Sequence, residues 1–564
     1  MSRNVAYSIF VATALFFAVF FLLPILHTLK GAFFGDRGLT FQYFFHIFGN
    51  RLYMEGLSNA FFIGVWSTLL SMAIALPLAI LSNRFIFPGK TVLSSLILIP
   101  LILPPFVGAI GIKQILGQQG ALNTLLSNLG LMDMANSPHD WLGENRFWGI
   151  IVMNALHLYP IIYLNITAAL ANLDPAMEEA AQDLGCSAAR RFWRITLPLM
   201  MPGVFAGATI VFIWSFTELG VPLIFDFHRV TSVQIFDGLK ELSGNPLPYA
   251  LVAVMLLVSV TLYSISKYLF GNNSFATSGR ASMASHARVL PVWHGIGCTA
   301  LFVVVTGIAV VPHIGVILMS VAGDWYQTVF PTDLTLQHFS DALGHELTVP
   351  SIANSLKYAS LSTLVDIVLG IGIAYVIVRT KIPGRGALDA ISMLPLAVPG
   401  LVLAFGYLAL SAEGEIFHFL VPGGNPIFIL VLAYAIRRLP YVVRSAVAGF
   451  QQTSPTLEEA AQNLGATPQR ALLRITIPLI AANLIAGGLL AFSFAMLEVS
   501  DSLVLAQEQS HYPITKAIYS LLSSLGNGQF LASALGVWAM LFLAITLIGA
   551  SLAIGKKLGA LFRV

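Results

Sequence analysis

The sequence predicts an all-α integral membrane protein with about twelve transmembrane helices in two tandem six-helix halves. Of its 564 residues, 57% are hydrophobic and only 10% are charged, whereas a soluble surface would need far more charge. Twelve apolar stretches are each long enough to cross roughly 30 Å of hydrocarbon. One polar segment also occurs twice, 280 residues apart.

The apolar stretches give the order of the predicted spans. Because backbone groups in lipid must satisfy their own hydrogen bonds, each span is expected to be a helix. The spans cover residues 5–29, 57–82, 91–116, 147–172, 198–222, 246–270, 290–320, 351–378, 387–410, 426–450, 478–506 and 530–555.

The distribution of Lys and Arg predicts the orientation of the chain. With the N-terminus inside, the cytoplasmic segments hold 17 of the 29 basic residues. The positive-inside rule therefore places both termini, and both copies of the polar segment, on the cytoplasmic side of the membrane. No basic block suggests nucleic acid as a partner.

The spans and a set of matched positions define a tandem repeat. At an offset of 295 residues, "FPGK" (Phe87–Lys90) aligns with "IPGR" (Ile382–Arg385), and Pro100 aligns with Pro395. The predicted domains are residues 1–270, a first six-span half, and 290–564, a second. Residues 271–289, which are rich in Ser, Gly and Asn, form the predicted cytoplasmic linker.

The polar segment reads "MEEAAQDLGCSAARRFWRITLP" from Met177 and "LEEAAQNLGATPQRALLRITIP" from Leu457. The two copies are identical at 12 of 22 positions. Each predicts a short helix, a turn and a second short helix, a unit that we call the elbow. A plain solvated loop is the alternative, but two matched copies disfavour it because two equal elbows imply two equal binding sites.

Turn and capping residues set the predicted boundaries of each elbow. Asp174-Pro175 and Ser454-Pro455 are expected to start the first helix. Gly185 and Gly465 are expected to end that helix. Ser187 and Thr467 are expected to cap the second helix.

Each elbow resembles the EAA motif, E-A-A-x(3)-G-x(9)-I-x-L-P, of permease subunits of binding-protein-dependent ABC importers. The first copy matches at Glu179, Ala180, Ala181, Gly185, Ile195, Leu197 and Pro198. The second copy matches at Glu459, Ala460, Ala461, Gly465, Ile475 and Pro478, with Ile477 where Leu is usual. A fused pair of this length resembles the ferric-iron transport permease group, and less closely the thiamine permeases.

The resemblance implies a type I ABC-importer-like fold in a bacterial plasma (inner) membrane, which forms the path for a small solute. Each elbow would be a coupling helix docked on a cytoplasmic ABC ATPase dimer, and an extracytoplasmic binding protein would deliver the solute. ATP and Mg would bind the ATPase, with no cofactor on this chain. The expected coupling residues are Glu178, Glu179, Ala180, Ala181, Gly185, Glu458, Glu459, Ala460, Ala461 and Gly465.

The solute that the resemblance favours is ferric iron. Thiamine, a polyamine, a phosphonate, a sugar phosphate or an oxyanion would suit the same architecture. An ion-coupled secondary transporter can also have two parallel six-span halves, but it needs no duplicated socket for an ATPase. An enzyme is not expected, because Gly89-Lys90-Thr91 lacks the first glycine of a phosphate-binding loop, having Arg84 in that place. No catalytic or metal-ligand cluster is legible.

Ionisable residues inside predicted spans are the remaining candidates, because burying them without a partner or a water-filled path is costly. Two interpretations stay open: they line the translocation path, or they pair structurally between helices. Asp501 follows Glu498 by three residues and is expected to share its helix face. The candidates are Glu218, Glu498, Asp501, Arg437, Arg438 and His157, which occupies the repeat position of Arg437.

Overall fold

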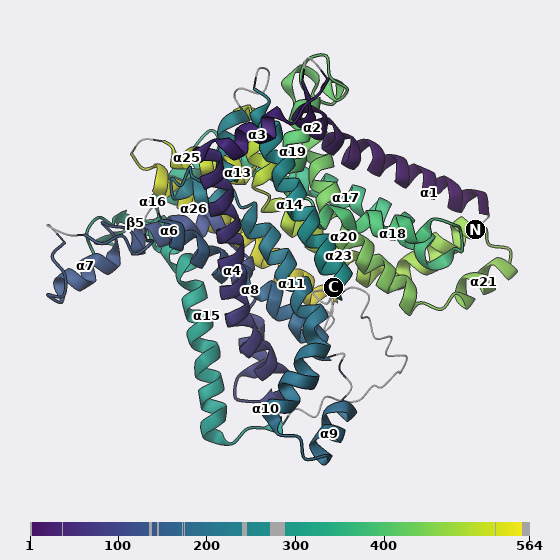
Figure 1. The fold of residues 1–564 in the computed structure, drawn as a ribbon, viewed down its shortest axis with the longest axis horizontal. Helices are drawn as coiled ribbons and strands as arrows, with labels where there is room; N and C mark the ends of the chain where they lie inside the picture. Colours follow the sequence, from purple (N-terminus) through teal and green to yellow (C-terminus); the bar gives the residue numbers. More distant parts are fainter. Residues whose placement is uncertain are drawn as a thin grey trace. The chain divides into compact units, whose positions relative to one another are not determined.

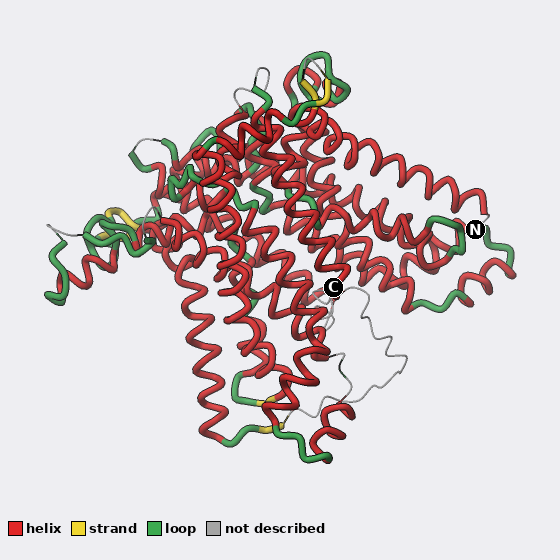
Figure 2. The backbone as a smooth tube through the Cα atoms, viewed as in Figure 1, coloured by secondary structure: helices red, strands yellow, loops and turns green. Residues whose placement is uncertain are grey.

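The computed structural model describes residues 3–35, 38–134, 138–143, 146–171, 173, 175–239, 245–270, 288–524 and 526–554. Helices form most of this part of the chain (Figures 1 and 2). The strands are short and make three two-stranded ladders, two antiparallel and one parallel. They are β1 (Phe34–Gly35) with β2 (Gly38–Leu39), β3 (Phe85–Ile86) with β4 (Arg288–Val289), and β5 (Ala322–Asp324) with β6 (Asp333–Leu334).

The candidate membrane spans correspond to the twelve apolar stretches. Among the described residues, nine helical segments are long and apolar enough to cross a membrane, and two bent helix pairs bring the number to 11. Helix α20 (Ile427–Gln452) accounts for the remaining stretch. Its three arginines, Arg437, Arg438 and Arg444, make it the most highly charged of the twelve stretches.

The third and ninth spans are not the continuous helices expected over 91–116 and 387–410. Segment Lys90–Leu101 meets Pro105–Asn128 at 94°, and Arg385–Leu396 meets Gly400–Leu410 at 95°. The breaks fall at Pro104 and Pro399, whose ψ angles of 134° and 141° are extended. Proline lacks an N–H and disfavours helix in the residue before it, so these two prolines end the first segments.

Contacts divide the chain into two compact units that differ from the sequence halves. The C-terminal unit comprises Met1–Met54, Gln234–Leu257 and Leu336–Phe562, and the central unit comprises mainly Glu55–Val233 and Val258–Thr335. The first span of each half therefore lies in the unit built mainly from the other half. The division at 1–270 and 290–564 stays a prediction about the repeat, and of the predicted linker only Arg288 and Val289 are described.

In the C-terminal unit, α17, α20 and α23 pack against one another, and α1 and α2 pack on α17 and α19 (Figure 1). A π-helical stretch, η1 (Ala18–Leu22), joins α1 to α2. The other helices are α1 (Arg3–Phe17), α2 (Leu23–Phe33), α3 (Gln42–Gly49), α16 (Gln337–Gly344), α17 (Thr348–Arg379), α18 (Arg385–Met393), α19 (Gly400–Leu410), α21 (Thr456–Asn463), α22 (Pro468–Ala471), α23 (Ile477–Met496), α24 (Ser500–Leu505), α25 (Ile514–Leu522) and α26 (Gly528–Ile554).

In the central unit, α8 packs on α11 and α15 packs on α6. Its helices are α4 (Arg51–Arg84), α5 (Lys90–Leu96), α6 (Pro105–Leu116), α7 (Ala121–Asn128), α8 (Phe147–Ala171), α9 (Pro175–Asp183), α10 (Ala188–Arg191), α11 (Leu197–Phe216), α12 (Gly220–Ile224) and α15 (Val292–Val321). Two helices have residues in both units, α13 (Thr231–Gly238) and α14 (Leu247–Phe270).

The exchanged first spans are seated on glycines at repeat-equivalent positions. A Cβ on Gly406 of α19 would lie 2.6 Å from the carbonyl oxygen of Pro24 in α2. A Cβ on Gly111 of α6 would lie 2.7 Å from the carbonyl oxygen of Pro312 in α15. Gly111 and Gly406 differ by the same 295 residues as the aligned prolines. The absence of a side chain thus lets the helix backbones meet in both units.

Substituting either glycine tests this packing. We expect Gly111→Ala and Gly406→Ala each to destabilise the protein by about 1–3 kcal/mol, because a methyl group would be forced against main-chain atoms. The matched control is Gly307→Ala on α15, where a Cβ would meet nothing within 4 Å. Thermal unfolding of the detergent-purified variants measures the effect. Equal melting temperatures for all three variants would contradict the close approach.

Candidate functional site

The two elbows have the same backbone geometry. Gly185 and Gly465 follow the first helices with φ of +77° and +88°, a left-handed conformation that suits glycine. In each copy the glycine N–H donates to a glutamine carbonyl of the preceding helix, at 2.9 Å in the first and 3.0 Å in the second. Ser187 and Thr467 cap the next helix by accepting the N–H of Arg190 and Arg470.

The starts of the elbows differ from the expectation in one copy. Helix α9 begins at Pro175, and Asp174 lies outside the described residues. Helix α21 begins at Thr456, one residue later than expected, and the Ser454 hydroxyl accepts the Thr456 N–H at 3.4 Å. A side-chain hydroxyl thus accepts a hydrogen bond from a backbone N–H that has no partner within the helix.

The two adjacent glutamates of each elbow face different surroundings. Glu178 pairs with Arg84, and the Thr196 hydroxyl donates to the same carboxylate oxygen. Glu458 pairs with Arg379 at 3.0 Å. Glu179 and Glu459, by contrast, are exposed. One carboxylate of each pair is thus held by the chain itself, and the other is presented to solvent.

An apolar side chain is also exposed at the same place in both elbows. Leu184 is 88% exposed and Leu464 is 89% exposed, each directly before its turn glycine. Ala180 and Ala460 are exposed beside them, and Ala181 and Ala461 are half-buried. Figure 1 shows α9 and α21 projecting at ends of their helix bundles. Each elbow therefore offers a small apolar surface flanked by a free carboxylate.

Four charged residues form a buried cluster in the C-terminal unit. Arg437 of α20 bonds Glu498 at 2.5 Å and Asp501 at 3.2 Å, and Arg438 bonds the other oxygen of Glu498. The side chains of Glu498 and Asp501 are 5% and 0% exposed. Two positive and two negative groups thus compensate one another where single charges would be costly.

The prediction that Glu498 and Asp501 share one helix face is wrong. Helix α23 ends at Met496 and α24 begins at Ser500, so Glu498 lies in the break between them. Its carboxylate accepts the backbone N–H of Asp501 at 3.3 Å. The side chain of Glu498 thereby satisfies a donor that the second helix start would leave unpaired.

Glu218 makes the same helix-start contact in the central unit. Its carboxylate accepts the N–H groups of Gly220 at 3.0 Å and Val221 at 3.3 Å. Val221 is the repeat equivalent of Asp501, so the second acidic group is specific to the second half. Glu218 is half-buried, whereas Glu498 is buried. The structure describes Glu218 and Glu498 in different units and does not place them relative to one another.

His157 and Arg437 each reach the bend of a broken span. The His157 Nδ1 lies 2.7 Å from the carbonyl oxygen of Pro100, just before the first bend. The guanidinium of Arg437 packs on Gly400, just after the second bend, where a Cβ would collide with it. The residue at this repeat position thus contacts the bend in both units. It is an imidazole, His157, in the central unit and a guanidinium, Arg437, in the C-terminal unit.

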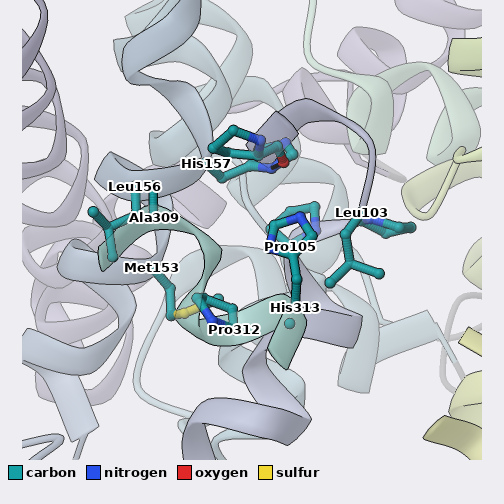
Figure 3. A pocket seen from close by; sticks show the side chains of 11 residues that line it. Leu103, Pro105, Met153, Leu156, His157, Ala309, Pro312 and His313 are labelled. Carbon is teal, nitrogen blue, oxygen red and sulfur yellow. Dashed lines mark hydrogen bonds between the residues drawn. The ribbon is translucent and has the colours of Figure 1, made fainter. Parts of the chain in front are cut away.

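His157 also lines a small pocket with a second histidine, His313 of α15 (Figure 3). The void has room for about one water molecule. It is lined by Pro100, Leu103, Pro104, Pro105, Gly108, Met153, Leu156, His157, Ala309, Pro312 and His313. In the described part of the chain, no group of three or more His, Cys, Asp or Glu residues is placed to hold a metal ion.

Sequence reasoning missed three polar residues that the structure makes prominent. Arg84 and Arg379 are the last residues of α4 and α17, and their repeat spacing was the available signal. Asp366 of α17 is fully buried, and neither carboxylate oxygen has a hydrogen-bond partner among the described residues. The sequence feature that could have pointed to Asp366 is that it is the one carboxylate in the apolar stretch 351–378.

Repeated halves, broken third spans and paired elbows define a multi-pass membrane protein built by duplication. The family model described as "Binding-protein-dependent transport system inner membrane component" matches residues 6–274 and 366–554. The chain belongs to this family. It is therefore a transport component of the inner membrane and not an enzyme, and membership implies a separate ATPase that binds ATP and a periplasmic binding protein.

Individual relatives are similar over much of the chain. A transport system permease protein of Haemophilus influenzae is 28% identical over 82% of this chain and 71% of its own length. The ferric transport system permease protein of Actinobacillus pleuropneumoniae is 27% identical over 81% of this chain and 64% of its own length. The molybdenum transport system permease protein of Escherichia coli is 31% identical over 36% of this chain and 84% of its own length.

The charge cluster predicts unequal effects of two matching substitutions. We expect Glu498→Gln to destabilise the protein by about 3–5 kcal/mol, because it leaves buried arginines without their partner. Glu218→Gln should be tolerated, because a glutamine oxygen can still accept the N–H groups of Gly220 and Val221. Folded yield and thermal unfolding in detergent measure both variants. Wild-type stability of Glu498→Gln would show that the cluster contributes little to folding.

Proposed function

We propose that this chain is the translocation subunit of an ATP-driven importer, and that each elbow is a docking site for one ATPase subunit. The observation that carries the proposal is the duplication of the elbow with its turn, its cap and its exposed leucine. Both elbows follow an even number of spans and so face the same side. We assign that side, and both termini, to the cytoplasm on the basis of the Lys and Arg distribution.

The exposed residues of the elbow support docking over a solvated loop. Leu184 and Leu464 are almost fully exposed on otherwise polar segments. Burying one leucine side chain stabilises a complex by about 1.5–3 kcal/mol. Glu179 and Glu459 are exposed and can pair with basic residues of a partner, whereas the adjacent glutamates are bound to arginine. The elbow thus combines an apolar anchor with a charged rim, as protein interfaces commonly do.

For the residues within the membrane, we assign different roles to the two halves. The Arg437, Arg438, Glu498 and Asp501 cluster acts as a structural pairing between α20 and the break after α23. Its charges are mutually compensated, which leaves little net charge to attract a solute. Glu218 is half-buried, and the apolar residue Val221 stands beside it at the repeat position of Asp501, so we assign Glu218 to the lining of the path. His157 supports the first bend.

We propose ferric iron as the solute. The support is a relative named as a ferric transport permease, which is similar over 81% of this chain. An oxyanion is the second candidate, because a molybdenum transport permease is 31% identical over 36% of this chain. A permeating solute requires only weak and temporary contacts, so the periplasmic binding protein is the component that selects it.

Docking is tested by removing the apolar anchor without changing the turn. We expect the Leu184→Asp, Leu464→Asp double variant to insert normally but to lose co-purification of the ATPase and solute uptake, because an aspartate would be buried unpaired at the interface. The Leu184→Met, Leu464→Met variant keeps an apolar side chain and serves as the control. Normal uptake by the aspartate variant would defeat the docking assignment.

The solute is tested on the periplasmic binding protein that acts with this chain. A thermal-shift measurement with ferric citrate and with sodium molybdate should raise the melting temperature with the iron salt alone, because a ligand that binds only the folded state stabilises it. A shift with molybdate alone would replace iron by an oxyanion and would leave the transport assignment intact.

A further inference from the structure

The residues that connect each elbow to the membrane helices are two arginines at helix ends. Arg84 is the last residue of the 34-residue helix α4, and Arg379 is the last residue of the 32-residue helix α17. The arginines differ by 295 residues and their glutamates, Glu178 and Glu458, by 280, the two offsets of the repeat. The same ion pair therefore occurs in both halves.

We propose that Arg84 and Arg379 are positioning residues that transmit the movement of each docked elbow to α4 and α17. The inference rests on the proposed function, since it concerns how the docked ATPase would act on the membrane helices. It assigns separate tasks to the adjacent glutamates: Glu178 and Glu458 hold the helix ends, while Glu179 and Glu459 face the partner.

The charges suit the helix ends that they join. Each arginine lies at the carboxyl end of a long helix, which carries partial negative charge, and each glutamate lies in the first turn of a short helix, which carries partial positive charge. Additional bonds fix the geometry. Arg84 donates to the Thr196 hydroxyl at 2.9 Å, and Arg379 donates to the Thr453 carbonyl at 2.7 Å.

The burial of the pairs makes the connection stiff, and stiffer in the second half. The side chains of Arg379 and Glu458 are 8% and 11% exposed, and the guanidinium lies 5.4 Å from the centre of the Phe450 ring. Arg84 and Glu178 are 25% and 26% exposed. A pair shielded from water is weakly screened, so separating its charges is costly. The elbow and the helix end should therefore move together.

The long helices lead to the polar residues in the membrane. In the C-terminal unit, α17 packs on α20, which carries Arg437 and Arg438. In the central unit, the Ser71 hydroxyl of α4 donates to the carbonyl of Ala155 in α8 at 3.3 Å, two residues before His157. A displacement of either long helix thus reaches the helix that supports the bend of its unit.

The test uses the transporter reconstituted in proteoliposomes with its ATPase, and the iron-loaded periplasmic binding protein as the stimulus. We expect the Arg84→Gln, Arg379→Gln double variant to retain the ATPase on purification. Stimulation of ATP hydrolysis by the loaded binding protein, and uptake of radioactive ferric iron per ATP, should each fall at least 10-fold. Arg84→Lys, Arg379→Lys should restore most of the stimulation, because it restores the charge.

The controls separate transmission from docking and from folding. Glu179→Gln, Glu459→Gln changes the adjacent outward carboxylates and should weaken retention of the ATPase instead. Arg84→Gln alone, at the more exposed pair, provides a variant whose folding is least at risk. Wild-type stimulation in the Arg84→Gln, Arg379→Gln double variant and in Arg84→Gln alone would overturn the inference. Loss of the ATPase from these two arginine variants would also overturn it. An ATPase that fails to bind even the wild-type chain would defeat the proposed function itself.

Discussion

The cost of leaving a charge or a backbone group unpaired in hydrocarbon determines where this protein places its polar residues. The cluster of Arg437, Arg438, Glu498 and Asp501 balances two charges of each sign. Glu218 and Glu498 occupy backbone donors at breaks in their spans. Arginines at the ends of α4 and α17 are bound by the elbows. In each of these three places a local partner accompanies the interruption of helix or apolar sequence, whereas Asp366 has no hydrogen-bond partner among the described residues.

Duplication preserved the backbone more closely than the chemistry. The third and ninth spans bend by 94° and 95°, and a residue at one repeat position reaches each bend. In the central unit that residue is His157, beside a small pocket that also contains His313. In the C-terminal unit it is Arg437, held by two carboxylates. Two halves of one chain can therefore carry different polar groups on the same scaffold.

The first span of each half packs in the unit that is built mainly from the other half. Helix α2 contacts α19 through Pro24 and Gly406, and α15 contacts α6 through Pro312 and Gly111. Each compact unit is completed by a helix from the other half of the sequence. Removing one half would thus strip the remaining unit of a packed helix. In a single fused chain this exchange occurs at a high effective concentration, which favours it over exchange between separate subunits.

The sequence by itself determined the helical class, the positions of the twelve apolar stretches, the repeat and the turn of each elbow. These features depend on local composition and on glycine, proline and capping chemistry, which act within a few residues. Tertiary structure decided which glutamate of each elbow is bound, since Glu178 and Glu179 are indistinguishable by type. It also decided the exchange of first spans, the break at Glu498 and the burial of Asp366. These depend on contacts between residues far apart in the chain, which periodicity and composition do not encode.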